Sequence, residues 1–346
     1  MPDFPIRELQ RFSMEALTKC GVPLEDAEIV TESIVFAHTT GKGTHGLGRL
    51  PIYLRKIQSG LMRRDTPLKP VVSALALEVL DADHGFGQVA AVHGMQRAIS
   101  MSETYGVGLV GIRHSNNFGT AAFIASAAVK ANKIGIVMSN AAPAISAPGS
   151  TTPILGTNPL AFGFPSGDDG SPIVFDMAIS NAARGKIRLA AANGEEIPEG
   201  WAVDENGVPT TSAEAALAGA MLPIGGAKGY GLALSVDILA GLLTGSAFGG
   251  GAKNLDHKTD RSDCGHFLLA IDVSKFMALQ DYQERISRLS KAVKSSGSPG
   301  VVILPGERSR RYMDDRNETV PLTPAVVEKL DTVSAELGLP PLESIR

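Results

Sequence analysis

The chain has 346 residues, enough for two or three domains around a sizeable hydrophobic core. Its formal charge of −4 gives no basic signal, so the composition does not favour nucleic-acid binding. Two cysteines, Cys20 and Cys264, stand far apart, which favours a reducing, cytoplasmic location over a disulfide framework. The first residues lack the apolar segment of a secretory signal.

The longest apolar run extends from Gly229 to Phe248. It carries Asp237 near its middle and is interrupted by glycines. A buried helix explains such a run better than a membrane span, because a charge at the centre of a bilayer is costly. We therefore expect no membrane partner.

Apolar periodicity and turn residues predict alternating helices and strands. The predicted helices lie at about 6–20, 23–37, 49–60, 87–105, 121–131, 279–295 and 323–337, with a long buried helix after Gly229. The predicted strands lie at 71–80, 107–112, 134–139, 160–164, 173–176, 267–272 and 301–304, and residues 190–222 are polar and rich in loops. These elements predict an α/β fold with helical segments at both termini. We expect residues 1–75 with 305–346 to form a helical domain, and residues 76–304 to form a sheet-containing region of two subdomains that binds cofactor and substrate.

The residues from Gly106 to Gly111 match the letters of the dinucleotide-binding pattern G-x-G-x-x-G. In a Rossmann unit these glycines follow a strand and open a helix. Here a predicted helix precedes them and a predicted strand contains them. No acidic residue for a ribose follows a second strand at the expected distance. We therefore expect no Rossmann fingerprint in this chain.

A better candidate for phosphate binding is the segment 222–231, which leads into the apolar helix. Gly225, Gly226 and Gly229 allow close approach of the backbone to an anion, and Lys228 adds a positive charge. It is not a Walker A loop, because Gly229 stands where a Ser or Thr would hold magnesium. A glycine-rich connection that allows tight helix packing, with Lys228 in solvent, explains these residues equally well.

The segment from Thr44 to Tyr53 holds a set of residues suited to hydroxy-acid chemistry. A helix is expected to start near Gly48, with Pro51 in its first turn. Arg49 can bind a carboxylate through two parallel N–H···O bonds, and His45 can move a proton near neutral pH. A capping or surface role is the commoner one for an isolated histidine, so this pattern alone does not establish catalysis.

Other motifs are missing. Cys264-Gly265-His266 has no second pair at a zinc spacing, so no metal site is predicted. The absence of a Gly-x-Ser-x-Gly elbow disfavours a hydrolase.

Over about residues 6–340 the chain resembles the type-2 malate/L-lactate dehydrogenase family. That family also includes ureidoglycolate and sulfolactate dehydrogenases, diketogulonate reductase and cyclic ketimine reductases. The resemblance rests on the segments 44–50, 114–119, 156–161, 175–178, 200–204, 222–231 and 304–307.

The resemblance implies a non-Rossmann nicotinamide-binding fold with a largely antiparallel mixed sheet. It also implies hydride transfer between NAD(P) and a small 2-hydroxy/2-oxo carboxylic acid, in a homodimer with sites near the interface. His45 would be the proton donor and acceptor, Thr44 its relay partner and Arg49 the carboxylate clamp. The further implied substrate contacts are Asn117 and Thr157, and Tyr53 is expected to join them because it shares a helical face with Arg49. The implied cofactor contacts are Asn117, Phe118, Gly119, Ser139, Asp176, Met177, Ala178, Lys228, Gly229, Pro305, Gly306 and Glu307.

The chain departs from the family at two positions. Thr44 stands where most relatives carry Ser, which keeps the hydroxyl group. Asn117 stands where many carry a second His, and Asn cannot titrate, so the proton is assigned to His45.

Two other functions stay open at this point: reduction of a cyclic ketimine carboxylate, and nucleotide binding without redox activity. The presence of both His45 and Arg49 argues against the second. The choice between NAD and NADP is also open, because Arg184 and Arg188 could meet a 2′-phosphate or lie in solvent.

Overall fold

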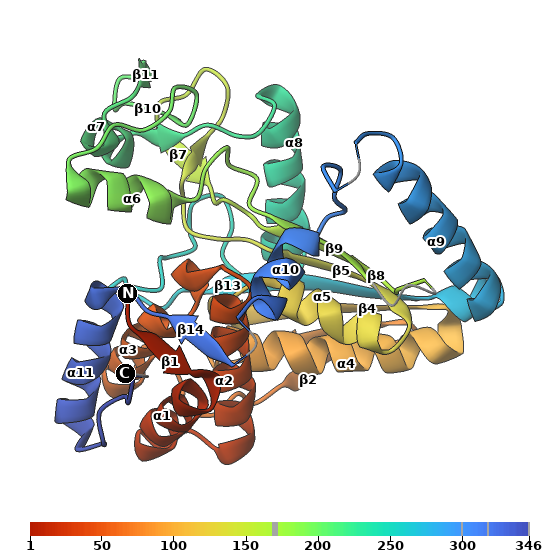
Figure 1. Cartoon of the computed structure of the whole chain (residues 1–346), viewed down its shortest axis with the longest axis horizontal. Coiled ribbons are helices and arrows are strands. Elements are labelled where there is room, and N and C mark those ends of the chain that lie inside the picture. Colours follow the sequence, from red (N-terminus) through yellow and green to blue (C-terminus); the bar gives the residue numbers. More distant parts are fainter. Residues whose placement is uncertain (168–171, 299, 317, 345–346) are drawn as a thin grey trace.

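The computed structural model describes residues 1–167, 172–298, 300–316 and 318–344 (Figure 1). Its central layer is a seven-stranded sheet in the order β2–β3–β4–β13–β5–β8–β9. Among these strands β3 and β4 pair in parallel, and the other neighbours are antiparallel. The sheet is therefore mixed and largely antiparallel, as the resemblance implied. Its strands are β2 (Lys69–Ala74), β3 (Leu77–Asp81), β4 (Val107–Ser115), β5 (Lys133–Ser139), β8 (Leu160–Phe164), β9 (Ile173–Met177) and β13 (Cys264–Asp272).

Helices α4 (Gly87–Tyr105) and α5 (Ala121–Lys130) cover one face of this sheet (Figure 1). Alternate strand residues such as Val110 and Leu268 point into the core beneath them. A Cβ atom added to Gly108 would lie 2.0 Å from the carbonyl oxygen of Ala98 in α4. Gly108 of the G-x-G-x-x-G letters thus allows a helix and a strand to pack closely, and Gly106 ends α4 with a positive φ. This confirms that the motif is not a Rossmann fingerprint.

Helices from both ends of the chain flank the sheet. They share one core, in which Phe12, Tyr53 and Leu330 are fully buried. Strand β1 (Asp3–Pro5) pairs with β14 (Thr319–Pro321), which fastens the two chain ends to each other. The helices are α1 (Ile6–Lys19), α2 (Leu24–Thr39), α3 (Leu50–Gln58) and α11 (Pro324–Leu337).

A second lobe lies across the other face of the main sheet, at the top of Figure 1. It contains a small sheet in the order β11–β10–β12–β6–β7, with its own core around Ile145, Ile187 and Met221. Helix α8 leads from this lobe to the main sheet. The remaining elements of the lobe are β6 (Ile145–Ser146), β7 (Pro153–Leu155), α6 (Arg184–Asn193), β10 (Ala202–Val203), β11 (Pro209–Thr210), α7 (Ala213–Ala218) and β12 (Ala220–Met221).

The strand predicted at 71–80 is wrong in two respects. The chain reverses direction at Leu75, which has φ of +48°, so the run is the hairpin β2–β3. Strand β2 is also exposed along its whole length rather than buried. No Gly or Asn marks the turn, and those residues are the usual sign of a positive φ.

The strand predicted at 301–304 is also wrong. These residues form a turn and a loop, in which the backbone N–H of Leu304 donates to Oε2 of Glu307 at 2.7 Å. This loop leads into α10 (Glu307–Asp314) and follows α9 (Leu279–Lys294). The four apolar residues do not share one environment, since Leu304 is buried and Val301 is exposed.

The apolar run after Gly229 is helical, as predicted, but it is not fully buried. It forms α8 (Ala227–Val236) and a π-helical continuation, η3 (Asp237–Leu242), which packs on the main sheet. Leu234, Ile238 and Leu242 are 38, 44 and 50% exposed. Among the described residues no helix is both long enough and apolar enough to cross a membrane.

Candidate active site

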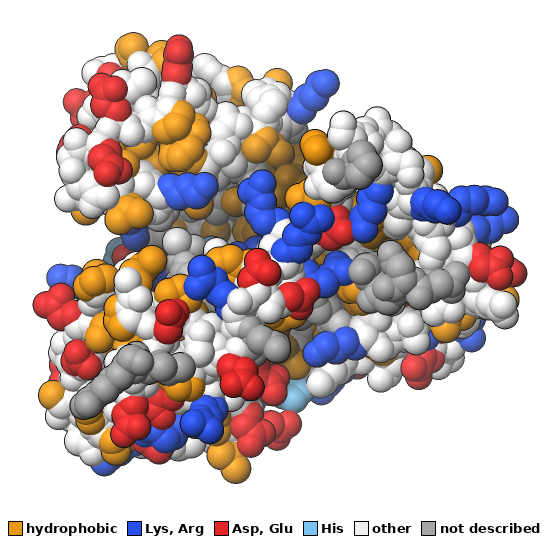
Figure 2. Space-filling view, viewed as in Figure 1, with side chains coloured by type: hydrophobic (Ala, Val, Ile, Leu, Met, Phe, Trp, Pro, Cys, Tyr) orange, Lys and Arg blue, Asp and Glu red, His pale blue; other side chains and the backbone are white. Residues whose placement is uncertain are grey.

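A cavity of about 480 Å³ lies where the helical segments, the main sheet and the second lobe meet. Its volume is within the usual range for small-molecule sites, about 300–1,000 Å³. In Figure 2 the surface is hollowed between the lobe that carries α6 and α8 and the helices below, and basic side chains gather beside this hollow. The predicted site residues that line the cavity are Thr44, His45, Arg49, Asn117, Phe118, Gly119, Ser139, Thr157, Asp176, Met177 and Ala178.

His45 is the last residue of the first of two short 3₁₀ turns, Gly43–His45 and Leu47–Arg49, that connect α2 to α3. Oγ1 of Thr44 is 3.2 Å from Nδ1 of His45. Nε of Arg49 donates to the backbone oxygen of Thr44 at 2.8 Å. Within the described structure the two Nη groups of Arg49 have no protein partner. They can therefore bind a carboxylate beside the imidazole.

The environment of His45 favours its neutral form. Burial lowers its pKa to about 4, the positive charges of Arg49 and Lys42 act in the same direction, and Asp176 partly offsets them. The free protein therefore presents an imidazole that can accept a proton at neutral pH.

Lys42 and Asp176 fasten the histidine loop to the edge of the main sheet. Nζ of Lys42 lies 2.6 Å from Oδ2 of Asp176, and the same oxygen accepts the backbone N–H of Ala122 at 3.1 Å. One carboxylate oxygen thus connects the loop before His45, strand β9 and the first turn of α5. This oxygen is occupied by protein groups, although Asp176 also lines the cavity.

A buried chain of hydrogen bonds orients the side chain of Asn117. Its Oδ1 accepts the backbone N–H of Gly119 at 3.1 Å and lies 3.5 Å from the hydroxyl oxygen of Tyr53. That hydroxyl accepts from Nε2 of Gln88 at 2.7 Å. Burial raises the pKa of Tyr53, so the phenol keeps its proton and donates it to Asn117. The Nδ2 group of Asn117 has no partner among the described residues, and Asn117 itself lines the cavity.

Tyr53 itself is fully buried and does not line the cavity. Tyr53 therefore lies between Asn117 and Gln88 in the hydrogen-bonded chain. Its hydroxyl contacts Asn117, and the expected direct contact of Tyr53 with substrate stays a prediction.

The wall that carries Phe118 rests on His266, a residue of β13 that sequence reasoning assigned only to the sheet. The two rings stack with centroids 4.8 Å apart. Nδ1 of His266 lies 2.9 Å from Oγ of Ser139, and Nε2 lies 2.8 Å from Oγ of Ser115. Ser139 donates its own proton to the Asn140 carbonyl, so Nδ1 of His266 is the donor. Burial lowers the pKa of His266 to about 3, which keeps this ring neutral.

The other predicted cofactor contacts lie outside the cavity. Lys228 is exposed in the first turn of α8. Gly229 is buried, and a Cβ there would meet the Ile224 carbonyl oxygen at 2.0 Å. The backbone oxygen of Pro305 accepts the N–H of Val174 at 3.2 Å, so the turn 305–307 lies beside β9. There Gly306, with φ of +91°, precedes α10, and Glu307 pairs with Lys294 at 2.6 Å.

Sequence reasoning missed the cationic character of the cavity. Helix α6 was not predicted: residues 184–189 were assigned to no element, and residues 190–193 were included in the polar, loop-rich region. Six basic residues line the cavity, against two carboxylates, Asp176 and Asp256. The basic residues are Lys42, Arg49, Arg184, Lys186, Arg188 and Lys253. The cluster Arg184-Gly185-Lys186-Ile187-Arg188 was the available signal.

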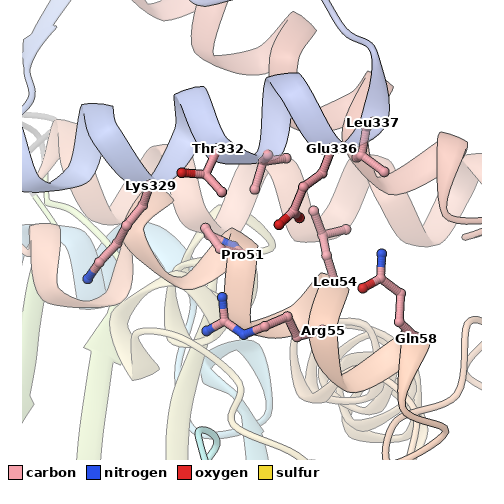
Figure 3. Close-up of a pocket in the computed structure, with 9 residues that line it drawn as sticks. Pro51, Leu54, Arg55, Gln58, Lys329, Thr332, Glu336 and Leu337 are labelled. Carbon is pink, nitrogen blue, oxygen red and sulfur yellow. The ribbon is translucent and has the colours of Figure 1, made fainter.

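A second groove, of about 90 Å³, lies between α3 and α11 and is too small for a metabolite (Figure 3). In the part of the chain that the structure describes, no group of three or more His, Cys, Asp or Glu residues could hold a metal ion. Cys20 and Cys264 are both free thiols.

Similar proteins are dehydrogenases of small hydroxy acids. Malate/(S)-sulfolactate dehydrogenase of Methanothermus fervidus is 38% identical over 94% of this chain and 95% of that protein. (2R)-3-sulfolactate dehydrogenase (NADP(+)) of Chromohalobacter salexigens is 38% identical over 94% of this chain and 96% of that protein. The structure of sulfolactate dehydrogenase from Methanocaldococcus jannaschii matches with a TM-score of 0.91 and 34% identity, over 97% of this chain and 98% of that one.

These similarities define an oxidoreductase that acts on hydroxy acids. The sequence model for malate/L-lactate dehydrogenase matches residues 4–331, and the chain belongs to that family. The family also contains a different reaction, since Delta(1)-pyrroline-2-carboxylate reductase of Ancylobacter novellus is 33% identical over 92% of this chain and 94% of that protein.

Proposed function

We propose that this enzyme transfers a hydride between NAD or NADP and a small 2-hydroxy/2-oxo carboxylic acid, with His45 as proton donor and acceptor. The observation that carries the proposal is the convergence of His45, Thr44 and the free Nη groups of Arg49 in one cavity. A carboxylate bound by Arg49 places the adjacent hydroxyl or carbonyl oxygen near the imidazole.

The part of the cavity wall formed by residues 117–119 suits a nicotinamide ring. It carries Phe118, whose ring stacks on His266, and the oriented amide of Asn117. It also offers the backbone of Gly119, where a Cβ would lie 2.8 Å from Oγ of Ser33. We assign Asn117, Phe118, Gly119 and Ser139 to the nicotinamide, which when bound supplies or takes up the hydride. The remaining cofactor contacts that we propose are Asp176, Met177, Ala178, Lys228, Gly229, Pro305, Gly306 and Glu307.

In oxidation, neutral His45 accepts the hydroxyl proton of the substrate at Nε2. This requires that Nδ1 carries the ring proton and donates it to Oγ1 of Thr44. In reduction, protonated His45 returns the proton to the new hydroxyl oxygen. The carboxylate of a bound substrate offsets the charge of Arg49, and so raises the pKa of His45 towards neutrality.

Asn117 has a different task in this proposal. Its amide cannot titrate, and the donors on its Oδ1 direct its Nδ2 group as a hydrogen-bond donor. Thr157 also lines the cavity and is proposed to contact the substrate.

The test is an absorbance assay of NADH and NADPH oxidation with a panel of 2-oxo acids and cyclic imine carboxylates. We expect turnover with at least one 2-oxo acid. Turnover confined to the cyclic imines would favour the ketimine reductase, the alternative that the Ancylobacter novellus relative supports. Binding of the dinucleotide without any turnover would contradict both.

We also propose that the enzyme is a homodimer and that the exposed face of α8 and η3 lies in its interface. Leu234, Ile238 and Leu242 are four residues apart and form one apolar stripe. Between Gly229 and Gly251 the sole charged residue is Asp237, which is buried and accepts the Gly249 N–H at 2.8 Å. An uncharged stripe is self-complementary across a two-fold axis.

Light scattering after size-exclusion chromatography tests this interface. Ile238→Glu is expected to give monomers, whereas Leu289→Glu, at an exposed position of α9, is expected to leave the dimer intact. A wild-type monomer would contradict the proposal, as would a dimer that Ile238→Glu leaves unaffected.

A further inference from the structure

Some basic side chains of the cavity have close protein partners, and others do not. Lys42 pairs with Asp176 at 2.6 Å. Arg184 donates to the carbonyls of Pro143 and Leu217 at 3.2 and 3.4 Å. Nζ of Lys186 lies 5.9 Å from the centre of the Trp201 ring. The basic residues left to receive a ligand are Arg49, Arg188 and Lys253.

Arg188 lies on the face of α6 that is turned towards His45. A Cβ on Gly185 would stand 3.3 Å from Cγ2 of Thr44, so the first turn of α6 touches the residue that precedes His45. Arg188 follows Gly185 by three residues, which places it on the same helix face about 4.5 Å further along the axis. Both arginine and histidine line the same cavity.

The present partner of Arg188 is weakly held. Its Nη1 atom lies 3.6 Å from Oδ2 of Asp256, and the two side chains are 49 and 44% exposed. An ion pair of this length and exposure contributes little to stability. Arg188 can therefore exchange Asp256 for an anionic group of a ligand at small cost.

Asp256 lies on a loop that is fixed independently of Arg188. Nζ of buried Lys56, in α3, donates to the backbone oxygen of Asp260 at 3.0 Å. The loop that carries Asp256 thus stays in place when Arg188 turns away from it.

We propose that Arg188 binds the second anionic group, a carboxylate or a sulfonate, of a dianionic 2-hydroxy/2-oxo acid. This inference rests on the proposed function. Arg49 binds the carboxylate beside the reacting carbon, and Arg188 binds the group at the other end of the substrate. In the free protein Asp256 occupies the place of that group. The excess of basic residues over carboxylates in the cavity suits a dianion better than a monoanion.

The contact between Gly185 and Thr44 favours this role over binding of a cofactor 2′-phosphate, and the experiment below separates the two. It puts the first turn of α6 at the end of the cavity that holds His45. The cofactor contacts that we propose outside the cavity include the turn 305–307, which lies beside β9.

The experiment compares kcat/KM for oxaloacetate with that for 2-oxovalerate, in which an ethyl group replaces the second carboxylate. Arg188→Gln is expected to lower the ratio of the two values about 10–100-fold, as for loss of a charge-assisted hydrogen bond. Asp256→Asn is expected to raise the ratio several-fold, because it removes the competing carboxylate. Lys253→Gln removes the same charge from the same cavity and is expected to change the ratio less than about threefold.

Three results would overturn the inference. Equal losses of the ratio in Arg188→Gln and Lys253→Gln would show a general charge effect. An unchanged ratio in Arg188→Gln, with turnover retained, would show that Arg188 does not touch the substrate. A rise in KM for NADPH but not for NADH, with no change in the ratio, would assign Arg188 to the cofactor.

All three results leave the proposed function intact, because the enzyme still reduces 2-oxo acids. A wild-type enzyme that reduces neither acid with either cofactor contradicts the proposed function, and this inference with it. Thermal melting of each variant checks that the exposed substitutions leave the fold intact.

Discussion

The imidazole of His38 lies directly beneath Gly46: a Cβ atom on Gly46 would stand 2.1 Å from Cδ2 of His38. His38 is a buried residue of α2, and burial lowers its pKa to about 4, so it is a neutral ring. The turn that carries His45 thus packs on the ring of His38. Any side chain at position 46 would displace this turn. The position of the proposed catalytic histidine therefore depends on a glycine and a second histidine.

Gly46→Ala is expected to lower kcat/KM at least tenfold, because a misplaced catalytic group loses much of its effect. Steady-state kinetics checks this, with thermal melting to show that the fold is retained. Adding His38→Ala to Gly46→Ala makes room for the methyl group and should restore part of the activity. A fully active Gly46→Ala enzyme would show that the turn tolerates displacement.

Arg49→Lys keeps the charge but loses the paired N–H groups. We expect a loss of about 10–100-fold in kcat/KM, mainly through KM, the effect of about 1.5–3 kcal/mol from a charge-assisted hydrogen bond. Kinetics with the best 2-oxo acid measures it. Full activity with lysine would mean that the carboxylate is not held by two parallel bonds.

Lys228→Ala is expected to weaken NAD(P)H binding roughly 5–10-fold, since it removes a cation next to a helix start that suits the cofactor diphosphate. Fluorescence titration of NADH and NADPH provides the measurement. Lys258→Ala, on an exposed loop, is the matched control. Equal affinities in the two variants would remove Lys228 from the cofactor site.

The buried histidines predict a loss of stability in acid. The pKa of His266 falls from 6.5 to about 3 on folding, so the unfolded chain binds more protons than the folded chain between these two pH values. The free energy of unfolding should therefore fall as the pH drops from 6.5 towards 3, by roughly 4 kcal/mol for this residue. His38 and His45 add to the effect down to about pH 4.

Urea unfolding at several pH values measures this slope. His266→Phe has no titrating group, so its stability should depend less on pH in that window, even though its stability at neutral pH is lower. The same pH dependence in His266→Phe and in the wild type would contradict the assignment to His266.

Local patterns were sufficient to predict much of the fold. Short apolar runs predicted β5 and β8 close to their observed bounds, because both strands lie inside the main sheet with strands paired on each side. The wrong context of Gly106–Gly111 was also readable, since a helix and a strand can be placed on either side of a motif. The hairpin at Leu75 was not readable, because its turn has no Gly or Asn. The loop 301–304 was misread because a short run of four apolar residues resembles a buried strand.

The candidate site shows the same division. Thr44, His45 and Arg49 are close in sequence, so their meeting could be predicted from the chain itself. The contacts of Gly46 with His38, Gly185 with Thr44, and Arg188 with Asp256 join separate elements. No local pattern encodes such contacts. Because α6 was not predicted, its basic residues could not be placed in the cavity.

The account assigns the proton to His45 and the cofactor contacts to other residues. His45→Gln should therefore lower the rate about 10²–10⁴-fold, while Asn117→Ala, which loses only a positioning amide, should cost less. The pKa of His45 in the free wild-type enzyme is near 4. Above this pKa, kcat/KM for reduction should fall about tenfold per pH unit. Below this pKa, kcat/KM for oxidation should fall as the pH drops.

The most direct test is the turnover of His45→Gln, measured beside its affinity for NADH and NADPH. The account predicts that turnover is lost while both affinities stay close to those of the wild type, because the proposed cofactor contacts do not include His45. Turnover near the wild-type rate would contradict the account, since the proton would then come from another group.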